Sequence, residues 1–276
     1  MGVLLDAKHE ARYAALIAAV ESELQTATQY ADPAVQVMVR HLLTAGGKRL
    51  RPLLVLLAAG FGDPNRPEVI SAAVAVELTH LATLYHDDVM DAAPIRRGEP
   101  SAHALWGNHA AILTGDLLFA RASKIVAGLG PQAVKIQAET FERLCLGELH
   151  EALGPGVGAD PVEFYLQILR DKTASLTAAA AQLGAFLAGA PSAAVSALTA
   201  YGELLGVAFQ LADDVLDLTG GAAVTGKEPG IDLRDGVATM PVLLLRQRVS
   251  GGAGTDVERR VVAALDGHLS DEATLA

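Results

Sequence analysis

With 276 residues, the chain is long enough to bury a large core, either as one big domain or as two ordinary ones. Hydrophobic residues make up 51% of it and aromatic residues only 4%, so Ala, Leu and Val must fill the interior, which suits close helix packing. The net charge of −11 argues against a nucleic-acid partner, and the single cysteine, Cys145, excludes a disulfide framework.

The first residues do not resemble a secretory signal, because Asp6 and Glu10 interrupt any apolar run. Together with the lone cysteine, which fits a reducing compartment, this leads us to expect a cytoplasmic protein.

Helical stretches then alternate with short Gly- and Pro-rich breaks, and no strand-like alternation of comparable length occurs. We expect about ten helices. No linker divides the chain, which predicts a single all-α domain over residues 1–276. Asp160-Pro161-Val162-Glu163 is typical of a helix start. The breaks are expected at 63–67, 92–100, 128–131, 154–161, 189–192 and 220–230.

The first basic motif is Gly46-Gly47-Lys48-Arg49-Leu50-Arg51-Pro52. Its glycine pair predicts a flexible turn that presents Lys48 and Arg51, three residues apart, in one direction. Alone, such a glycine-rich turn is weak support for a phosphate site.

An acidic cluster, Asp87-Asp88-Val89-Met90-Asp91, ends a long apolar stretch. On a helix Asp87 and Asp91 share a face, and His80 lies on the same stripe. Carboxylates are unfavourable at a helix C-terminus, so the cluster indicates a bound cation rather than a helix-stabilising role. The next loop carries Arg96 and Arg97, which suit either salt bridges to these carboxylates or bidentate phosphate binding.

Residues 173–202 contain no charge and are long enough to suggest a membrane span. The break at Gly189-Ala190-Pro191-Ser192 divides the segment, so we expect two buried helices and no transmembrane segment.

A second acidic cluster repeats the first: Asp213-Asp214-Val215-Leu216-Asp217. Two such clusters facing each other across a cavity suit several Mg²⁺ ions, which bind one or two carboxylates together with substrate phosphate oxygens. The basic residues Lys172 and Lys227, with those above, suit two phosphate clamps, one with metal and one without. That division predicts two diphosphate substrates.

Mg²⁺ on a diphosphate makes it a good leaving group, and an allylic carbon then becomes a carbocation. Oxygen atoms of Thr173 and Gln210 are suited to stabilise that positive charge.

These motifs closely resemble the trans-isoprenyl diphosphate synthase (polyprenyl synthetase) family, and their order covers nearly the whole chain. The matching stretches are 46–52, 80–91, Arg96-Arg97-Gly98, Trp106-Gly107-Asn108, Gly115-Asp116, Lys172-Thr173, 209–214, Gly226-Lys227 and Asp232-Leu233.

The resemblance implies an all-α antiparallel bundle around a deep central cavity (the isoprenoid synthase fold), usually homodimeric, with three Mg²⁺ ions per active site. The roles it implies are as follows: Asp87, Asp91, Asp213 and Asp217 at the metals, with Asp88 and Asp214 in support; Lys48, Arg51, His80 and Arg97 on isopentenyl diphosphate; Arg96, Lys172 and Lys227 on the allylic diphosphate; and Thr173 and Gln210 at the cation. The reaction would be ionisation, head-to-tail condensation and proton loss to pyrophosphate.

Product length in this family depends on what blocks the cavity below the first cluster. Ala82 and Thr83 are small where short-chain members often carry aromatic residues, and Thr79, one turn earlier, is also modest in size. We therefore expect all-trans products longer than C20, with peripheral membrane contact for long products.

Three features depart from the family pattern. Val237 stands where Lys is usual, His103 stands where Asn is common, and the sequence ends at Ala276, earlier than is usual for the family.

Three alternatives remain beside the long-chain synthase. They are a short-chain (C10 to C20) synthase, a class I terpene cyclase, and a noncatalytic partner subunit of a heteromeric synthase. A cyclase has no need for the metal-free clamp of Lys48, Arg51 and His80, and a noncatalytic subunit has no need for two complete acidic clusters.

Overall fold

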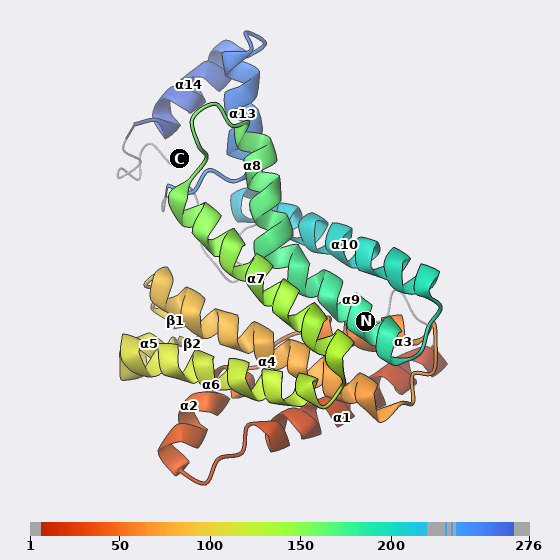
Figure 1. Ribbon diagram of the computed structural model, residues 1–276. Helices are drawn as coiled ribbons and strands as arrows, with labels where there is room; N and C mark the ends of the chain where they lie inside the picture. The colour runs from red at the N-terminus through yellow and green to blue at the C-terminus, as the bar shows by residue number, and fades with distance from the viewer. Residues whose placement is uncertain (1–6, 220–229, 231–232, 234–235, 268–276) are drawn as a thin grey trace. The chain divides into compact units, whose positions relative to one another are not determined.

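The computed structural model describes residues 7–219, 230, 233 and 236–267 (Figure 1). Within these residues the chain is helical apart from β1 (Ile95–Arg96) and β2 (Glu99–Pro100), which pair antiparallel as a short hairpin. The predicted all-α class is confirmed. The helices are α1 (Ala7–Ala27), α2 (Pro33–Thr44), α3 (Leu50–Ala59), α4 (Pro67–Met90), α5 (Ala102–Trp106), α6 (Asn108–Ala127), α7 (Pro131–Leu153), α8 (Pro161–Ile168), the π-helix η1 (Leu169–Ala174), α9 (Ser175–Leu187), α10 (Ser192–Thr219), α13 (Met240–Ser250) and α14 (Asp256–Leu265).

The chain divides into two compact units. The first contains the residues up to Arg143 and Ser175–Glu203, and the second contains Leu144–Ala174 and the residues from Leu204 onward. The chain crosses from one unit to the other three times, so neither unit is a continuous segment.

Helix α4 is the core of the first unit. It is buried from Val69 to Asp88 on nearly every side, as expected for a helix whose apolar residues surround its axis. It packs against α6, α3, α9 and α1, and its alanines allow these helices to approach closely. Gly115 of α6 lies directly against the ring of His86, where a side chain would collide. Any other residue at this position would displace the His86 ring from the α4–α6 contact.

The second unit is built around α8, η1 and the end of α10. As predicted, Asp160 caps α8, and its side chain accepts a hydrogen bond of 2.9 Å from the backbone N–H of Val162. The helix then widens into the π-turn η1, a feature often found at functional sites. Gly147 of α7 packs against the backbone of Lys172, where a Cβ would lie 2.6 Å from its nitrogen.

Most predicted breaks are confirmed, and one expectation about burial is half wrong. Breaks occur at residues 63–67, 92–100, 128–131, 154–161 and 189–192, whereas most of 220–230 lies outside the described residues.

Helix α9 is buried as expected, but α10 begins with residues 192–201 largely at the surface. Because Ala, Ser and Thr are compatible with either environment, the absence of charge did not establish burial there.

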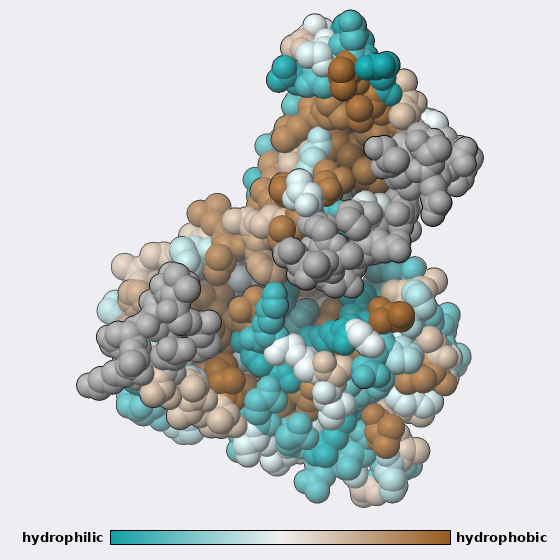
Figure 2. All heavy atoms as spheres, turned by 180° about the vertical axis from the view of Figure 1, so that it is seen from behind, coloured by the Kyte–Doolittle hydropathy of each residue, from teal (hydrophilic) through white to brown (hydrophobic). Residues whose placement is uncertain are grey.

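Among the helices of the described ranges, two, α4 and α10, are long and apolar enough to cross a membrane by length and composition. Helix α4 is mostly buried inside its own unit, which is the ordinary behaviour of a core helix. Apolar side chains also reach the molecular surface in Figure 2. On α10 the exposed ones are Tyr201, Leu204, Leu205, Phe209, Val215 and Leu216.

Candidate active site

The first acidic cluster occupies the C-terminal end of α4 in the first unit. Asp88 is fully buried (0% exposed), and its Oδ1 accepts a hydrogen bond of 2.6 Å from Arg96 Nε. Burial raises the pKa of Asp88, although Arg96 opposes the shift. Asp87 is half-buried, and Asp91, the C-cap residue, is exposed. The middle carboxylate is therefore held by the protein, while Asp91 remains accessible to a ligand.

Arg96 takes one of the two roles that its sequence context allowed. It pairs with Asp88, and its side chain remains partly exposed. Asp88 Oδ2 is buried and has no hydrogen-bond partner among the residues that the structure describes. A buried carboxylate oxygen of this kind is able to accept a further hydrogen bond or to bind a cation. This acidic end of α4 therefore still has capacity for a cationic ligand.

A group of cationic side chains lies beside this cluster in the same unit. Arg51 stands in the first turn of α3, and Arg97 follows the first strand of the hairpin. Arg51 Nε is buried without a hydrogen-bond partner in the described part of the chain. Burial lowers the pKa of Arg51, and the neighbouring Arg97 adds to this effect. Lys48, in the loop before α3, is exposed.

His80 completes this group from the stripe of α4 that also carries Asp87. Burial lowers the pKa of His80 well below its usual range, and the charges of Arg51 and Arg97 lower it further. The ring is therefore neutral at pH 7, with one nitrogen able to donate and the other able to accept a hydrogen bond. A neutral His among guanidinium groups leaves the positive charge of this group undiminished, which suits it to a diphosphate.

The second acidic cluster lies in the last turns of α10, in the second unit. Asp214 is 2% exposed, and its Oδ2 accepts a hydrogen bond of 2.8 Å from the Tyr165 hydroxyl. Gln210 Nε2 donates to the other oxygen at 3.4 Å, and Gln210 Oε1 accepts from Thr173 Oγ1 at 3.4 Å. Asp213 is exposed and Asp217 half-buried. Asp214, Gln210 and Thr173 thus form one chain of hydrogen bonds.

Lys172 lies in the π-turn η1 and is held by two carboxylates of α7. Its Nζ is 3.0 Å from Glu148 Oε2 and also bonds Glu151. Burial alone would lower the pKa of Lys172, but Glu151 and Glu148 outweigh it and raise that pKa above its usual value. The lysine is therefore fully charged, and a diphosphate would have to compete with these glutamates for it.

The donor atoms of both clusters are carboxylate oxygens, which suit a hard cation such as Mg²⁺. Within the described ranges, no three or more His, Cys, Asp or Glu side chains gather into a ready metal site. The arrangement fits a metal that takes part of its coordination from a phosphate-bearing substrate, as Mg²⁺ commonly does.

Among the residues predicted to control product length, Thr79 lines a small apolar cavity within the first unit. Its hydroxyl donates to the Ala75 carbonyl at 2.9 Å, so it adds no unpaired polar group to the wall. Ala82 is fully buried and Thr83 half-buried, and neither lines this cavity. The other lining residues are Ala75, Val76, Val126, Gln137, Thr140, Leu176, Ala179 and Leu183.

The departures noted in the sequence have different outcomes. Val237 is largely exposed. His103 shares a hydrogen bond of 2.8 Å with the Ala93 carbonyl, which anchors the loop before Arg96. Lys227 and Asp232 lie outside the described residues.

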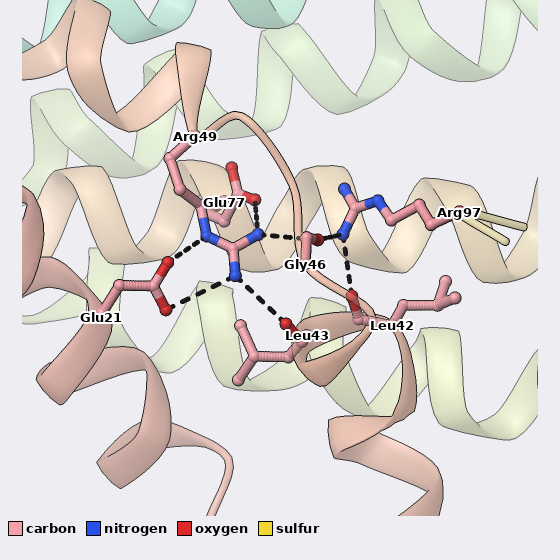
Figure 3. A network of polar contacts seen from close by, with 7 residues as sticks. All are labelled: Glu21, Leu42, Leu43, Gly46, Arg49, Glu77 and Arg97. Atoms are coloured by element: carbon pink, nitrogen blue, oxygen red, sulfur yellow. Dashed lines mark hydrogen bonds and ion pairs between the residues drawn. The ribbon is translucent and has the colours of Figure 1, made fainter. Parts of the chain in front are cut away.

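Sequence reasoning did not find five residues of these sites. Tyr165, Glu148 and Glu151 carry no local signal, because only the fold brings them to Asp214 and Lys172. Glu77, a charge inside the apolar run of α4, and Arg49, inside the basic motif, were both visible. Figure 3 shows the hydrogen bond between Arg49 and Glu77.

The chain resembles known proteins over nearly its full length. The family model described as polyprenyl synthetase matches residues 32–261. Nonaprenyl diphosphate synthase of Mycobacterium tuberculosis is 44% identical, with 97% of this chain and 79% of that protein aligned. Heptaprenyl diphosphate synthase component 2 of Geobacillus stearothermophilus is 46% identical, over 82% of this chain and 71% of that protein.

A solved structure agrees with these sequence relatives. Geranylgeranyl pyrophosphate synthase of Corynebacterium glutamicum, crystallised with calcium and isoprenyl diphosphate, superposes with a TM-score of 0.85 at 42% identity. The match covers 98% of this chain and 81% of that one. The chain therefore belongs to the polyprenyl synthetase family and is a prenyltransferase.

Proposed function

We propose that this protein condenses isopentenyl diphosphate head-to-tail with an allylic diphosphate, in a Mg²⁺-dependent reaction that gives all-trans products longer than C20. The observation that carries the proposal is the buried, unpartnered Nε of Arg51 among Arg97 and a neutral His80. A positive, metal-free pocket of this kind has a use in a synthase, which binds a second diphosphate. It has none in a cyclase.

The acidic and basic groups lie close enough to act on one another. The negative charge of Asp87 raises the pKa of Arg51, against the larger effect of burial. The condensation requires such proximity, because an allylic cation formed at the acidic cluster must be reached by the double bond of the second substrate.

Asp87, Asp91, Asp213 and Asp217 would hold the Mg²⁺ ions, three of them by the family resemblance, and Asp88 and Asp214 would orient the two clusters. Mg²⁺, when bound, neutralises charge that develops on the departing pyrophosphate. Lys172, Arg96 and Lys227 are the proposed cationic contacts of the allylic diphosphate. The oxygens of Thr173 and Gln210, linked to Asp214, would face the developing cation.

Product length is proposed from the wall of α4. Thr79 presents no bulky side chain to the apolar cavity, and Ala82 and Thr83, which lie on the next turn of α4 and do not line the cavity, carry no aromatic ring. Two relatives named for nonaprenyl and heptaprenyl products support a long product. Gln137 and Thr140 also line the cavity and are its most polar residues with Thr79.

We further propose a single-domain, cytoplasmic homodimer that contacts membranes peripherally when its product is long. Exposed apolar side chains on the first unit, namely Ile112 and Leu113 of α6 and Phe141 of α7, support a dimer. Leu113 is 61% exposed and directly follows the exposed Ile112 in the chain. Adjoining exposed apolar side chains of this kind are unusual on a monomer surface. Light scattering of the purified protein would measure the state directly.

The test is mass analysis of products made from isopentenyl diphosphate with C5, C10, C15 and C20 primers, with Mg²⁺ and with EDTA. We expect extension beyond C20 with pyrophosphate release only when Mg²⁺ is present. Conversion of a primer to a hydrocarbon without extension would favour a cyclase, and products ending at or below C20 would favour a short-chain synthase.

One relative is named as component 2 of a synthase, so the reaction should also be run in the presence of cell extract. Activity that appears only after extract is added, and that co-purifies with another protein, would favour the partner-subunit alternative.

A further inference from the structure

A buried glutamate lies behind the proposed isopentenyl diphosphate pocket. Glu77 is 2% exposed and lies on α4, three residues before His80, so the two share a side of the helix. Its Oε1 accepts a hydrogen bond of 3.0 Å from Arg49 Nη1. Arg49, Arg51 and Arg97 all act on its charge, each lowering its pKa against the larger effect of burial. One carboxylate therefore partly offsets the positive charge of three guanidinium groups.

Arg49 connects this glutamate to the loop that carries the clamp (Figure 3). Besides Glu77, its guanidinium donates to Glu21 of α1, to the Leu43 carbonyl at 3.2 Å and to the Gly46 carbonyl at 3.3 Å. The Leu43 carbonyl is one of the last of α2, and it also accepts a hydrogen bond of 3.3 Å from the backbone N–H of Gly46. A single side chain thus joins α1, α4 and the end of α2.

Arg97 approaches the same loop from the opposite side. It donates to the Leu42 carbonyl at 2.8 Å and shares the Gly46 carbonyl with Arg49. Gly47 lies between the two guanidinium groups, since a Cβ there would be 2.7 Å from Arg49 Nη1 and 3.1 Å from Arg97 Cζ. Two like charges this close need a nearby negative charge, which the buried Glu77 supplies together with Glu21.

The backbone shows why the side chain of Arg49 matters to Arg51. Arg49 precedes α3 as its N-cap residue and adopts the left-handed conformation (φ 50°), which disfavours residues other than glycine. Arg97 is also left-handed (φ 55°). Conformations of this kind persist only where surrounding contacts fix them. Because Arg51 lies in the turn that Arg49 begins, the conformation of Arg49 sets the position of Arg51.

We propose that Glu77, acting through Arg49, is a positioning residue for the isopentenyl diphosphate pocket. It holds the 46–49 loop and the first turn of α3 so that Arg51 and Arg97 are in place before the substrate arrives. The inference rests on the proposed function, since it concerns the second diphosphate of that reaction.

Two opposite effects make the idea testable. Removing the charge of Glu77 makes the pocket more positive, which by electrostatics alone would strengthen diphosphate binding. Loss of positioning would weaken that binding. Glu77→Gln changes the charge, whereas Arg49→Lys keeps it but removes the forked contacts of the guanidinium. Glu203→Gln, which breaks the Arg143–Glu203 pair in the same unit, is the control.

The experiment measures KM for each diphosphate, kcat, and isopentenyl diphosphate affinity by calorimetry without Mg²⁺. Glu77→Gln and Arg49→Lys should each weaken isopentenyl diphosphate binding about tenfold, the loss of about 1.4 kcal/mol, with KM for the allylic substrate nearly unchanged. The control should change neither. Tighter binding in Glu77→Gln, or an equal rise in both KM values, would overturn the proposal.

If Glu77→Gln does not fold, Arg49→Lys and Glu21→Gln decide, because Glu21 is the half-exposed outer partner of Arg49. Glu21→Gln should raise the isopentenyl diphosphate KM two- to threefold, and no change in either variant would overturn the proposal. Wild-type protein that binds isopentenyl diphosphate without condensing it would refute the proposed function only. The variant affinities would still decide the role of Glu77.

Discussion

The two acidic clusters share one sequence pattern but are held by different chemistry. In both, the middle Asp is buried, at 0% exposure for Asp88 and 2% for Asp214. Asp88 is paired with the charged Arg96, whereas Asp214 is bound by the neutral groups of Tyr165 and Gln210. In both clusters, therefore, the middle carboxylate is buried and bonded to the protein, but the residues that bind it differ.

The charged groups around the two clusters also differ. The first cluster adjoins a pocket with several guanidinium groups and one buried counter-ion, Glu77. The second adjoins one lysine, Lys172, which two glutamates already bind. The pocket beside the first cluster thus has more guanidinium groups than carboxylates, whereas the surroundings of Lys172 carry an excess of acid. We expect a metal-free diphosphate to bind beside the first cluster, whereas a diphosphate near Lys172 requires bound Mg²⁺.

The largest expected effect is common to both clusters. Asp87→Ala and Asp213→Ala should each lower kcat by about 10³-fold, because each removes a proposed metal ligand that acts on the developing charge. Circular dichroism should show unchanged helix content. Asp266→Ala at the end of α14 is the control, and it should retain activity. Near wild-type turnover in either variant would exclude that aspartate from the metal site.

The two basic regions should separate the two substrates. Arg51→Ala should raise KM for isopentenyl diphosphate, and Lys172→Ala should raise KM for the allylic diphosphate, each by about 10²-fold. A charged hydrogen bond to phosphate is worth roughly 1.5–3 kcal/mol, which gives this order of magnitude. Steady-state kinetics with one substrate varied at a time measures the effect. The assignment fails if both variants affect the same substrate.

Asparagine at the middle positions should expose the difference in how the clusters are held. Asp88→Asn loses an ion pair with Arg96 and should destabilise the protein by about 1–2 kcal/mol. Asp214→Asn can still accept the 2.8 Å hydrogen bond from Tyr165 through its amide oxygen and loses only the longer, 3.4 Å bond from Gln210, so its loss should be smaller. Chemical denaturation compares the two, and equal losses would show that the charged partner at Asp88 has no special importance.

The sequence predicted the parts of this fold that local chemistry decides. Gly- and Pro-rich breaks ended the helices where expected, and Asp160 began α8 as expected, because capping and turn formation involve neighbours in sequence. The acidic repeat and the basic motif were likewise readable as candidate ligand groups. The shared side of α4 that carries His80 and Asp87 follows from helix periodicity alone.

What the sequence did not predict depends on distant contacts. Tyr165 and Asp214 meet only because α8 and α10 pack together, and the π-turn at Lys172 has no local signature. The exposed start of α10 had the same small residues as the buried α9. Arg49 was passed over because a motif shows residue types and not which side chain is turned inward.

The smallest expected effect is a pH dependence confined to the first region. The folded-state pKa of His80 lies well below the unfolded value of about 6.5, chiefly through burial. The unfolded chain therefore binds the proton more readily, so the contribution of His80 to stability is complete above pH 6.5 and is lost as pH falls toward its folded pKa. The loss is at most about 1.4 kcal/mol per pH unit. Between pH 7 and 5.5 the melting temperature of the wild type should fall more than that of His80→Gln, which has no proton to gain there. An equal fall in melting temperature in the two proteins would show that His80 is not the group responsible for this pH dependence.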